Sequence, residues 1–186
     1  MEEYPKPVTK QCMKAILEQM NHNIIYKINP KNDSFSSGFF CYIKKRKNKK
    51  IPVVIINTYI VDEKLADAIN IIINDEVKTI KTGYIKYRNK ELNISMLEIK
   101  EYENYNINFL EIDDNIYNKD IESYYNKESI YIMNYKNENN ISISFGVINN
   151  INESQMKYST NIYPNLHGSP IFNLSNNSSL SKSVPS

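Results

Sequence analysis

Nine short runs of β-branched and aromatic residues, separated by polar turns, constrain the fold of this chain more than any other feature. Runs of this kind, with turn signals roughly every 8–12 residues, are typical of strands in an antiparallel sandwich or barrel. The predicted strands are Ile24–Ile28, Ser37–Ile43, Ile51–Asn57, Ile69–Asn74, Glu76–Lys81, Ile94–Lys100, Ser129–Tyr135, Ile141–Ile148 and Lys157–Asn161. The chain is therefore predicted to be mostly β.

Residues 9–21 carry the one clear helical pattern. Cys12, Ile16 and Met20 recur every four residues, with Met13 and Leu17 beside them, which gives one apolar stripe. Thr9 is the predicted N-cap, because its hydroxyl can accept a free amide of the first turn. We expect this helix to pack on the core rather than to bind a partner. Two shorter helical segments are predicted at Glu63–Ala68 and Asn118–Tyr125.

The distribution of these elements divides the chain into five parts. Residues 1–23 hold the helix and its lead-in, residues 24–100 a first β unit, and residues 129–174 a second one. Residues 101–128 are polar, acidic and rich in Tyr and Asn, as expected for a connector. Residues 175–186 are rich in Ser and Asn and are predicted to form a disordered tail.

Composition excludes several classes of protein. The 186 residues carry a net charge of +2, which is too small to indicate nucleic-acid or membrane binding through the bulk field. No window approaches the roughly 18 apolar residues of a membrane span, and Met1–Pro5 has no signal-like apolar run. We therefore expect an intracellular, cytoplasmic protein. The two cysteines, Cys12 and Cys41, suffice for neither a disulfide framework nor a metal site, and we interpret them as small buried hydrophobes.

One basic run lies between two predicted strands. It consists of Lys44, Lys45, Arg46, Lys47, Lys49 and Lys50, with Asn48 among them. Because it carries no interleaved aromatic residues, we interpret it as a solvated hairpin tip. Nucleic-acid binding through it is the weaker alternative.

Four segments follow one another in an order that a known family shares. They are Ser-Ser-Gly-Phe-Phe-Cys-Tyr-Ile at 36–43, Ile-Pro-Val-Val-Ile-Ile-Asn-Thr-Tyr-Ile-Val at 51–61, Leu-Asn-Ile-Ser-Met-Leu-Glu-Ile at 92–99, and Asn-Leu-His-Gly-Ser-Pro-Ile at 165–171. With the connector segment 109–113, they resemble the trypsin-like serine proteases over most of residues 8–174. The corresponding family segments read Gly-Thr-Gly-Phe-Phe, Pro-Val-Leu-Ile-Thr-Asn-Asn-His-Val-Leu, Leu-Asp-Ile-Thr-x-x-Glu-Ile and Gly-x-Ser-Gly-Ser-Pro. The resemblance implies a double antiparallel β-barrel of six strands each, with the active site in the cleft between the barrels.

The same resemblance implies that all three catalytic positions are changed. Tyr59 takes the place of the general-base histidine, Asn93 that of the orienting aspartate, and His167 that of the nucleophilic serine. A phenol with a pKa near 10 is a poor base at neutral pH, and a carboxamide carries no charge to stabilise an imidazolium. Asn165 replaces an oxyanion-loop glycine. The leading hypothesis is a catalytically inactive trypsin-like domain that binds a peptide or protein in the inter-barrel cleft.

Two alternatives remain open at the level of sequence. The first is a serine endopeptidase with a displaced active site, for which Ser169 is the weak candidate nucleophile. The second is a truncated, non-functional gene product, because the family continues after Ile171 with further strands that this chain does not show. The second barrel is accordingly expected to be incomplete. No cofactor is expected, and His22 with His167 falls short of a zinc ligand set.

Overall fold

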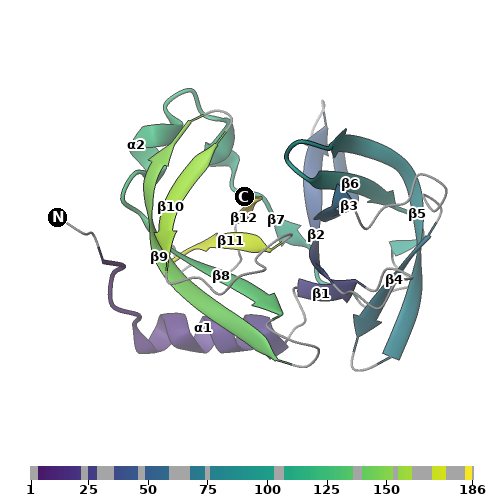
Figure 1. Ribbon diagram of the computed structural model, residues 1–186, viewed down its shortest axis with the longest axis horizontal. Coiled ribbons are helices and arrows are strands. Elements are labelled where there is room, and N and C mark those ends of the chain that lie inside the picture. The colour runs from purple at the N-terminus through teal and green to yellow at the C-terminus, as the bar shows by residue number, and fades with distance from the viewer. Residues whose placement is uncertain are drawn as a thin grey trace.

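The strands of this protein form two sheets, antiparallel except for one short parallel pairing, and these sheets build two lobes lying side by side (Figure 1). The computed structural model describes residues 4–21, 25–28, 36–45, 49–58, 68–73, 76–102, 107–135, 140–152, 155–160, 169–174 and 183–185. The strands are β1 (Ile25–Ile28), β2 (Ser36–Lys45), β3 (Lys49–Asn57), β4 (Ala68–Ile73), β5 (Glu76–Asn89), β6 (Ile94–Ile99), β7 (Leu110–Glu111), β8 (Ser129–Tyr135), β9 (Ile141–Ile151), β10 (Met156–Thr160), β11 (Pro170–Asn173) and β12 (Ser183–Pro185). The helices are α1 (Lys10–Asn21), the 3₁₀ helix η5 (Asp114–Tyr117) and α2 (Ile121–Tyr125).

The first lobe is a closed barrel of six strands. Its order is β1-β4-β5-β6-β3-β2, and a further pairing between β1 and β2 joins the two ends. That pairing sets Ile25 opposite Phe39 and Ile28 opposite Ser36. Closure removes the exposed edges that an open sheet would offer to other chains. The short strand β7 then pairs in parallel with β2 and leads the chain toward the second lobe.

The second lobe has five strands in the order β10-β9-β8-β11-β12. Among the described residues no pairing joins β10 to β12, so the described part of this sheet is open. The incompleteness of the second barrel stays a prediction, because residues 161–168 and 175–182 lie outside the described residues. The tail needs a correction: within 175–186, which was predicted to be disordered, Ser183–Pro185 forms β12 against β11. Pairing with β11 satisfies backbone amides and carbonyls of β12. The Ser- and Asn-rich composition alone does not reveal this pairing. The other tail residues lie outside the described residues.

The buried residues form three clusters. One cluster fills the first barrel and takes its residues, such as Phe40, from β2 to β6. A second cluster, which includes Ile132, fills the second lobe. The third, which we call the inter-barrel cluster, lies between the lobes. Its buried members are Cys12, Ile16, Phe39, Cys41, Ile51, Val53, Ile55, Leu110, Tyr131, Met133, Phe172 and Leu174. Strands β2, β3, β8 and β11 contribute alternate residues to a barrel interior and to this cluster, so both of their faces are buried.

The N-terminal helix packs on the inter-barrel cluster as predicted. Thr9 caps it, since its hydroxyl accepts the Cys12 amide at 3.1 Å, and Cys12 and Ile16 are buried. The apolar stripe is narrower than the sequence indicated, because Met13 and Leu17 are 39% and 50% exposed. No helix in the described part of the chain is long and apolar enough to cross a membrane.

Both cysteines are free thiols buried in the inter-barrel cluster, as the sequence predicted for small hydrophobes. Burial raises the pKa of Cys41 to about 12. A thiol with such a pKa remains protonated at neutral pH and is a poor nucleophile.

The connector carries the second helical region. The expectation of a helix over Asn118–Tyr125 is met by α2 in its C-terminal part, and η5 precedes it. Asp113 caps η5 by accepting the Asn115 amide at 3.1 Å. Residues 63–67 of the other predicted helix, Glu63–Ala68, lie outside the described residues, and Ala68 begins β4.

Gly146 on β9 permits the close approach of β10. A Cβ atom at this position would lie 2.4 Å from the Ser159 carbonyl oxygen and 2.8 Å from the Thr160 Cβ. Both contacts are shorter than packed atoms tolerate, so β10 could pair with β9 in this register only after a backbone shift.

We therefore expect Gly146→Ala to lower the free energy of unfolding by about 1–3 kcal/mol, measured by urea denaturation. Asn150→Ala, at an exposed position of the same strand, is the matched control and is expected to change stability by less than about 0.5 kcal/mol. Equal stability of the two variants would contradict the tight β9–β10 contact.

Candidate functional site

The ends of β3 and β6 bring together two of the positions that the sequence analysis singled out. Asn57, the last residue of β3, pairs with Ile94, the first residue of β6. One step further, the Thr58 amide donates to the Asn93 carbonyl at 3.1 Å. Asn93 therefore lies beside the point at which the chain passes from Thr58 into Tyr59. Tyr59 itself lies outside the described residues.

A buried polar network supports this junction. The Ser95 hydroxyl donates to the Thr58 hydroxyl at 3.1 Å, and the Thr58 hydroxyl donates to the Asn89 carbonyl at 3.2 Å. Ser95 and Thr58 are both buried. Buried hydroxyls with partners hold their backbone in a fixed place, because breaking one bond leaves its partner unsatisfied. The network thus fixes the turn that carries Asn93 against the end of β3.

The backbone of Asn93 has its own structural requirement. Its φ angle is 54°, in the left-handed region, and its amide donates to the Lys90 carbonyl at 3.3 Å. Asn and Asp enter this region more readily than other residues with a side chain, because their short polar groups can bond locally. The turn therefore favours the residue types Asn and Asp at position 93.

Ser169, the weak alternative nucleophile, lies directly before β11. It is 2% exposed, and its hydroxyl oxygen is buried with no hydrogen-bond partner in the described part of the chain. A nucleophile must reach a substrate carbonyl, so this hydroxyl could attack only after the surrounding backbone moved. Asn165, His167 and the preceding loop lie outside the described residues, as does His22.

The inter-barrel cluster links the two halves of the candidate site. Ile94, which follows Asn93, packs against this cluster, and Phe172, three residues after Ser169, belongs to it. A hydrogen bond from the Tyr135 amide to the Ser37 hydroxyl, at 3.3 Å, joins β8 to β2 across the same interface. The structure thus places the strand after Asn93 and the strand after Ser169 on one buried surface between the lobes.

The sequence analysis missed a second feature, a pocket of about 160 Å³ beside the basic run. Lys44 forms an ion pair with Asp114, and Lys50 forms one with Glu111. The hydrogen bond with Glu111 is the main cause that raises the pKa of Lys50. Tyr42 and Tyr117 line the pocket together with these charges. The acidic character of the connector was the available signal, but its pairing with the hairpin depends on the fold.

These ion pairs change how the basic run is interpreted. Two of its cations, Lys44 and Lys50, are compensated by carboxylates of the connector, which weakens the positive field that nucleic-acid binding requires. Arg46 and Lys47 lie outside the described residues. The backbone register of the β2–β3 pairing sets Lys45 opposite Lys49.

No group of three or more potential metal ligands occurs within the described ranges. The predicted absence of a metal site at His22 and His167 stays a prediction, because neither histidine is among the residues the structure describes.

Comparison with known proteins identifies the fold. No protein-family model and no curated protein sequence matches the chain. Among solved structures, Deg5 is 11% identical, with a TM-score of 0.56 over 89% of this chain and 82% of that one. An inactive mutant form of Rv3671c from M. tuberculosis is 10% identical, with a TM-score of 0.57 over 93% and 80%. The serine protease of a human pathogenic astrovirus is 12% identical, with a TM-score of 0.54 over 82% and 77%.

These similarities show that the chain has the trypsin-like double β-barrel fold, with a short N-terminal helix. Identities of 10–12% show the fold alone.

The left-handed backbone at Asn93 gives a stability prediction. We expect Asn93→Val to be less stable than Asn93→Gly by about 1–2 kcal/mol in urea denaturation, because a β-branched side chain is strained at positive φ. Asn93→Asp is expected to stay close to the parent protein. Equal stability of the Val and Gly variants would show that the turn does not require this backbone conformation.

Proposed function

We propose that this chain is a trypsin-like domain that lacks protease chemistry and binds an extended peptide or protein segment beside the junction of Thr58 and Asn93. The observation that carries the proposal is the hydrogen bond from the Thr58 amide to the Asn93 carbonyl. It supports the alignment of Asn93 with the family's orienting carboxylate, at a position adjacent to Tyr59, where the family has its base. A carboxamide stands where the chemistry needs a negative charge.

The chemical argument follows from what each position can do. In a serine protease, an imidazole takes the proton of the serine hydroxyl, and a carboxylate holds that imidazole in the required tautomer. Asn93 cannot stabilise an imidazolium, and Tyr59 is a poor base at neutral pH. With His167 at the nucleophile position, no hydroxyl stands there to form an acyl-enzyme. Loss of the nucleophile alone costs on the order of 10⁶ in turnover.

The surface beside Asn93 supports binding. Leu92, the residue before Asn93, is 52% exposed, and Tyr87, near the end of β5, is also exposed. The Asn89 side-chain amide donates to the Tyr87 hydroxyl at 3.2 Å and so restrains the ring. An apolar side chain and a restrained aromatic ring beside a polar turn are the types of group that contact a peptide side chain.

The absence of chemistry is tested with a fluorophosphonate probe, which reacts with activated serines. We expect the full chain to remain unlabelled at neutral pH, and Ser169→Ala to behave identically. Labelling of the parent protein that disappears in Ser169→Ala would overturn the proposal in favour of a displaced endopeptidase site.

Binding is tested with fluorescein-labelled, carboxymethylated casein, an unfolded polypeptide that reports anisotropy and cleavage together. We expect saturable binding without cleavage, and at least about a fivefold weaker affinity in Leu92→Ser, or about 1 kcal/mol. Val77→Ser is the matched control, because Val77 is an exposed apolar residue near the other end of β5. Equal weakening by both variants would contradict a site beside Asn93.

A further inference from the structure

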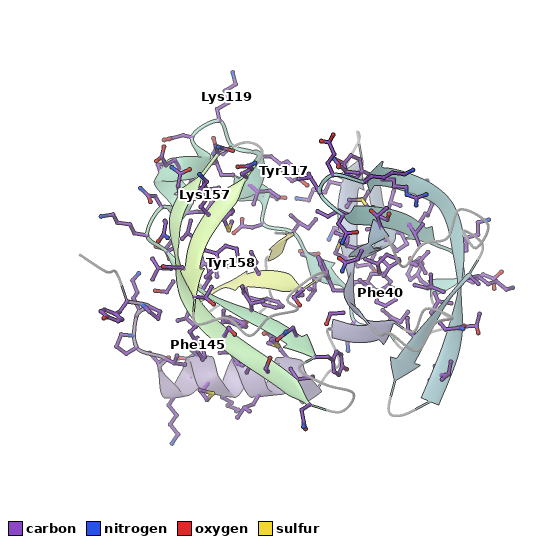
Figure 2. All side chains as sticks on the ribbon, viewed as in Figure 1. Phe40, Tyr117, Lys119, Phe145, Lys157 and Tyr158 are labelled. Atoms are coloured by element: carbon purple, nitrogen blue, oxygen red, sulfur yellow. The ribbon has the colours of Figure 1, made fainter. Side chains whose placement is uncertain are left out.

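The pocket of about 160 Å³ lies between the β2–β3 hairpin of the first barrel and the connector. Its lining residues come from both sides, from the hairpin Tyr42, Lys44 and Lys50, and from the connector Glu111, Ile112, Asp114 and Tyr117. Figure 2 labels Tyr117 at the side of the second lobe that faces the first. Lys50 is the second residue of β3 and Asn57 is the last. This pocket and the proposed site beside Asn93 therefore lie at opposite ends of one strand.

One wall of the pocket is an aromatic ring that its neighbours hold in place. Tyr42 stacks on Phe109 with ring centroids 4.7 Å apart. Tyr102 meets both rings edge-on, at 6.4 Å from Tyr42 and 5.6 Å from Phe109. The Lys50 ammonium lies 5.7 Å from the centroid of the Tyr42 ring. These contacts fix the wall before any ligand arrives, and a pre-formed site costs a ligand less free energy than one that it has to organise.

The charges of the pocket are sorted by side. Lys44 and Lys50 are opposite each other in the β2–β3 register, so their side chains lie on one face of the hairpin. The connector supplies the carboxylates, since Asp114 forms an ion pair with Lys44 and Glu111 forms one with Lys50. The pocket thus has a cationic hairpin side and an anionic connector side, and these four groups carry no net charge.

This arrangement selects among the possible charges of a ligand. An anion attracted by the two lysines would be repelled by the two carboxylates, and a cation would meet the reverse. A molecule that carries both charges, separated from each other, meets an opposite charge on each side. All four side chains are roughly half exposed, so their ion pairs contribute little to stability and can rearrange around such a ligand at small cost.

The volume limits the size of the ligand. A cavity of about 150 Å³ accommodates a benzene ring, and drug-sized ligands occupy pockets of about 300 Å³ or more. A pocket of about 160 Å³ is therefore suited to one ring-sized side chain. Tyr42, Ile112 and Tyr117 provide the surfaces against which such a side chain would pack.

We propose that the pocket between the β2–β3 hairpin and the connector binds a small zwitterion, an α-amino acid with an aromatic side chain. Its carboxylate faces Lys44 and Lys50, and its ammonium group faces Glu111 and Asp114. The ring packs against the apolar part of the lining. Because the ligand contacts the first barrel and the connector together, its binding stabilises their contact.

The test compares four forms of para-fluorophenylalanine that share one ring and differ in charge. They are the free amino acid, its N-acetyl derivative, its amide and its N-acetyl amide, which are a zwitterion, an anion, a cation and a neutral molecule. Binding to the full chain is followed by fluorine NMR. We expect saturable binding of the free amino acid with a Kd of about 1 mM or tighter, and at least about tenfold weaker binding of the other three forms.

Two variants locate the ligand in the pocket. Lys50→Gln and Glu111→Gln each remove one charge from one side, and each is expected to weaken binding of the free amino acid at least about fivefold. Lys81→Gln is the matched control, because Lys81 forms a similarly exposed ion pair with Glu101 and neither residue lines the pocket. This control is expected to leave binding unchanged. Circular dichroism melting checks that all three variants fold.

Several outcomes would overturn the proposal. Equal binding of the neutral form and the free amino acid would show that the charges play no part. Tighter binding of the anion or the cation, absence of saturable binding, or equal affinities of folded Lys50→Gln and Lys81→Gln would each contradict it as well. Casein binding is expected to persist in Lys50→Gln, because that probe is assigned to the other end of β3, so the two proposals fail separately.

Discussion

The inter-barrel cluster is the contact on which the rest of the structure depends. Phe39, Val53, Tyr131 and Phe172 come from strands of both barrels, and Ile16 of α1 joins them. Each of these strands also lines the interior of its own barrel, so removing the cluster would expose one face of four strands at once. Burial of apolar surface stabilises by about 25 cal/mol per Å², so this interface stabilises the arrangement of the two lobes. The candidate site lies at the margin of this contact, because Ile94 packs on it directly after Asn93.

Polar groups at one end of the first barrel are satisfied locally. Ser95 and Thr58 are buried at the end of β6 and β3, and each uses its hydroxyl for a neighbour within the same turn region. The described part of this junction holds hydroxyl, carboxamide and backbone groups, which are less costly to bury than ions.

Many of the strands could be predicted because the pattern of apolar residues along each of them matches the faces that it buries. The runs at 51–57 and 129–135 are almost continuously apolar, as strands buried on both faces must be, and both predictions are confirmed by β3 and β8. The strand at 76–81 was predicted too short, because β5 continues through Gly83 to Asn89 with register shifts that no local pattern reveals. The resemblance assigned Asn93 and Tyr59 to one site, whereas the contact of Asn93 with Thr58, its left-handed backbone and the pairing of Lys44 with Asp114 depend on tertiary structure. Tyr59, Asn165 and His167 lie outside the described residues, so their roles stay predictions.

The two lobes differ in which elements supply their interior clusters. The first is closed by strands alone, and its interior cluster takes its buried members from β2 to β6, among them Phe40, which Figure 2 labels in that lobe. The interior cluster of the second lobe includes Ile121 and Tyr125 from α2, with Ile116 of η5 packed against it. Burial, and then the negative charge of Asp113, raise the pKa of Tyr125, so its phenol stays neutral inside the lobe. The connector helix therefore supplies apolar side chains to a barrel that has five described strands. In this lobe, the connector contributes buried side chains to the interior. Among the described residues, no strand pairs with the outer edge of β10.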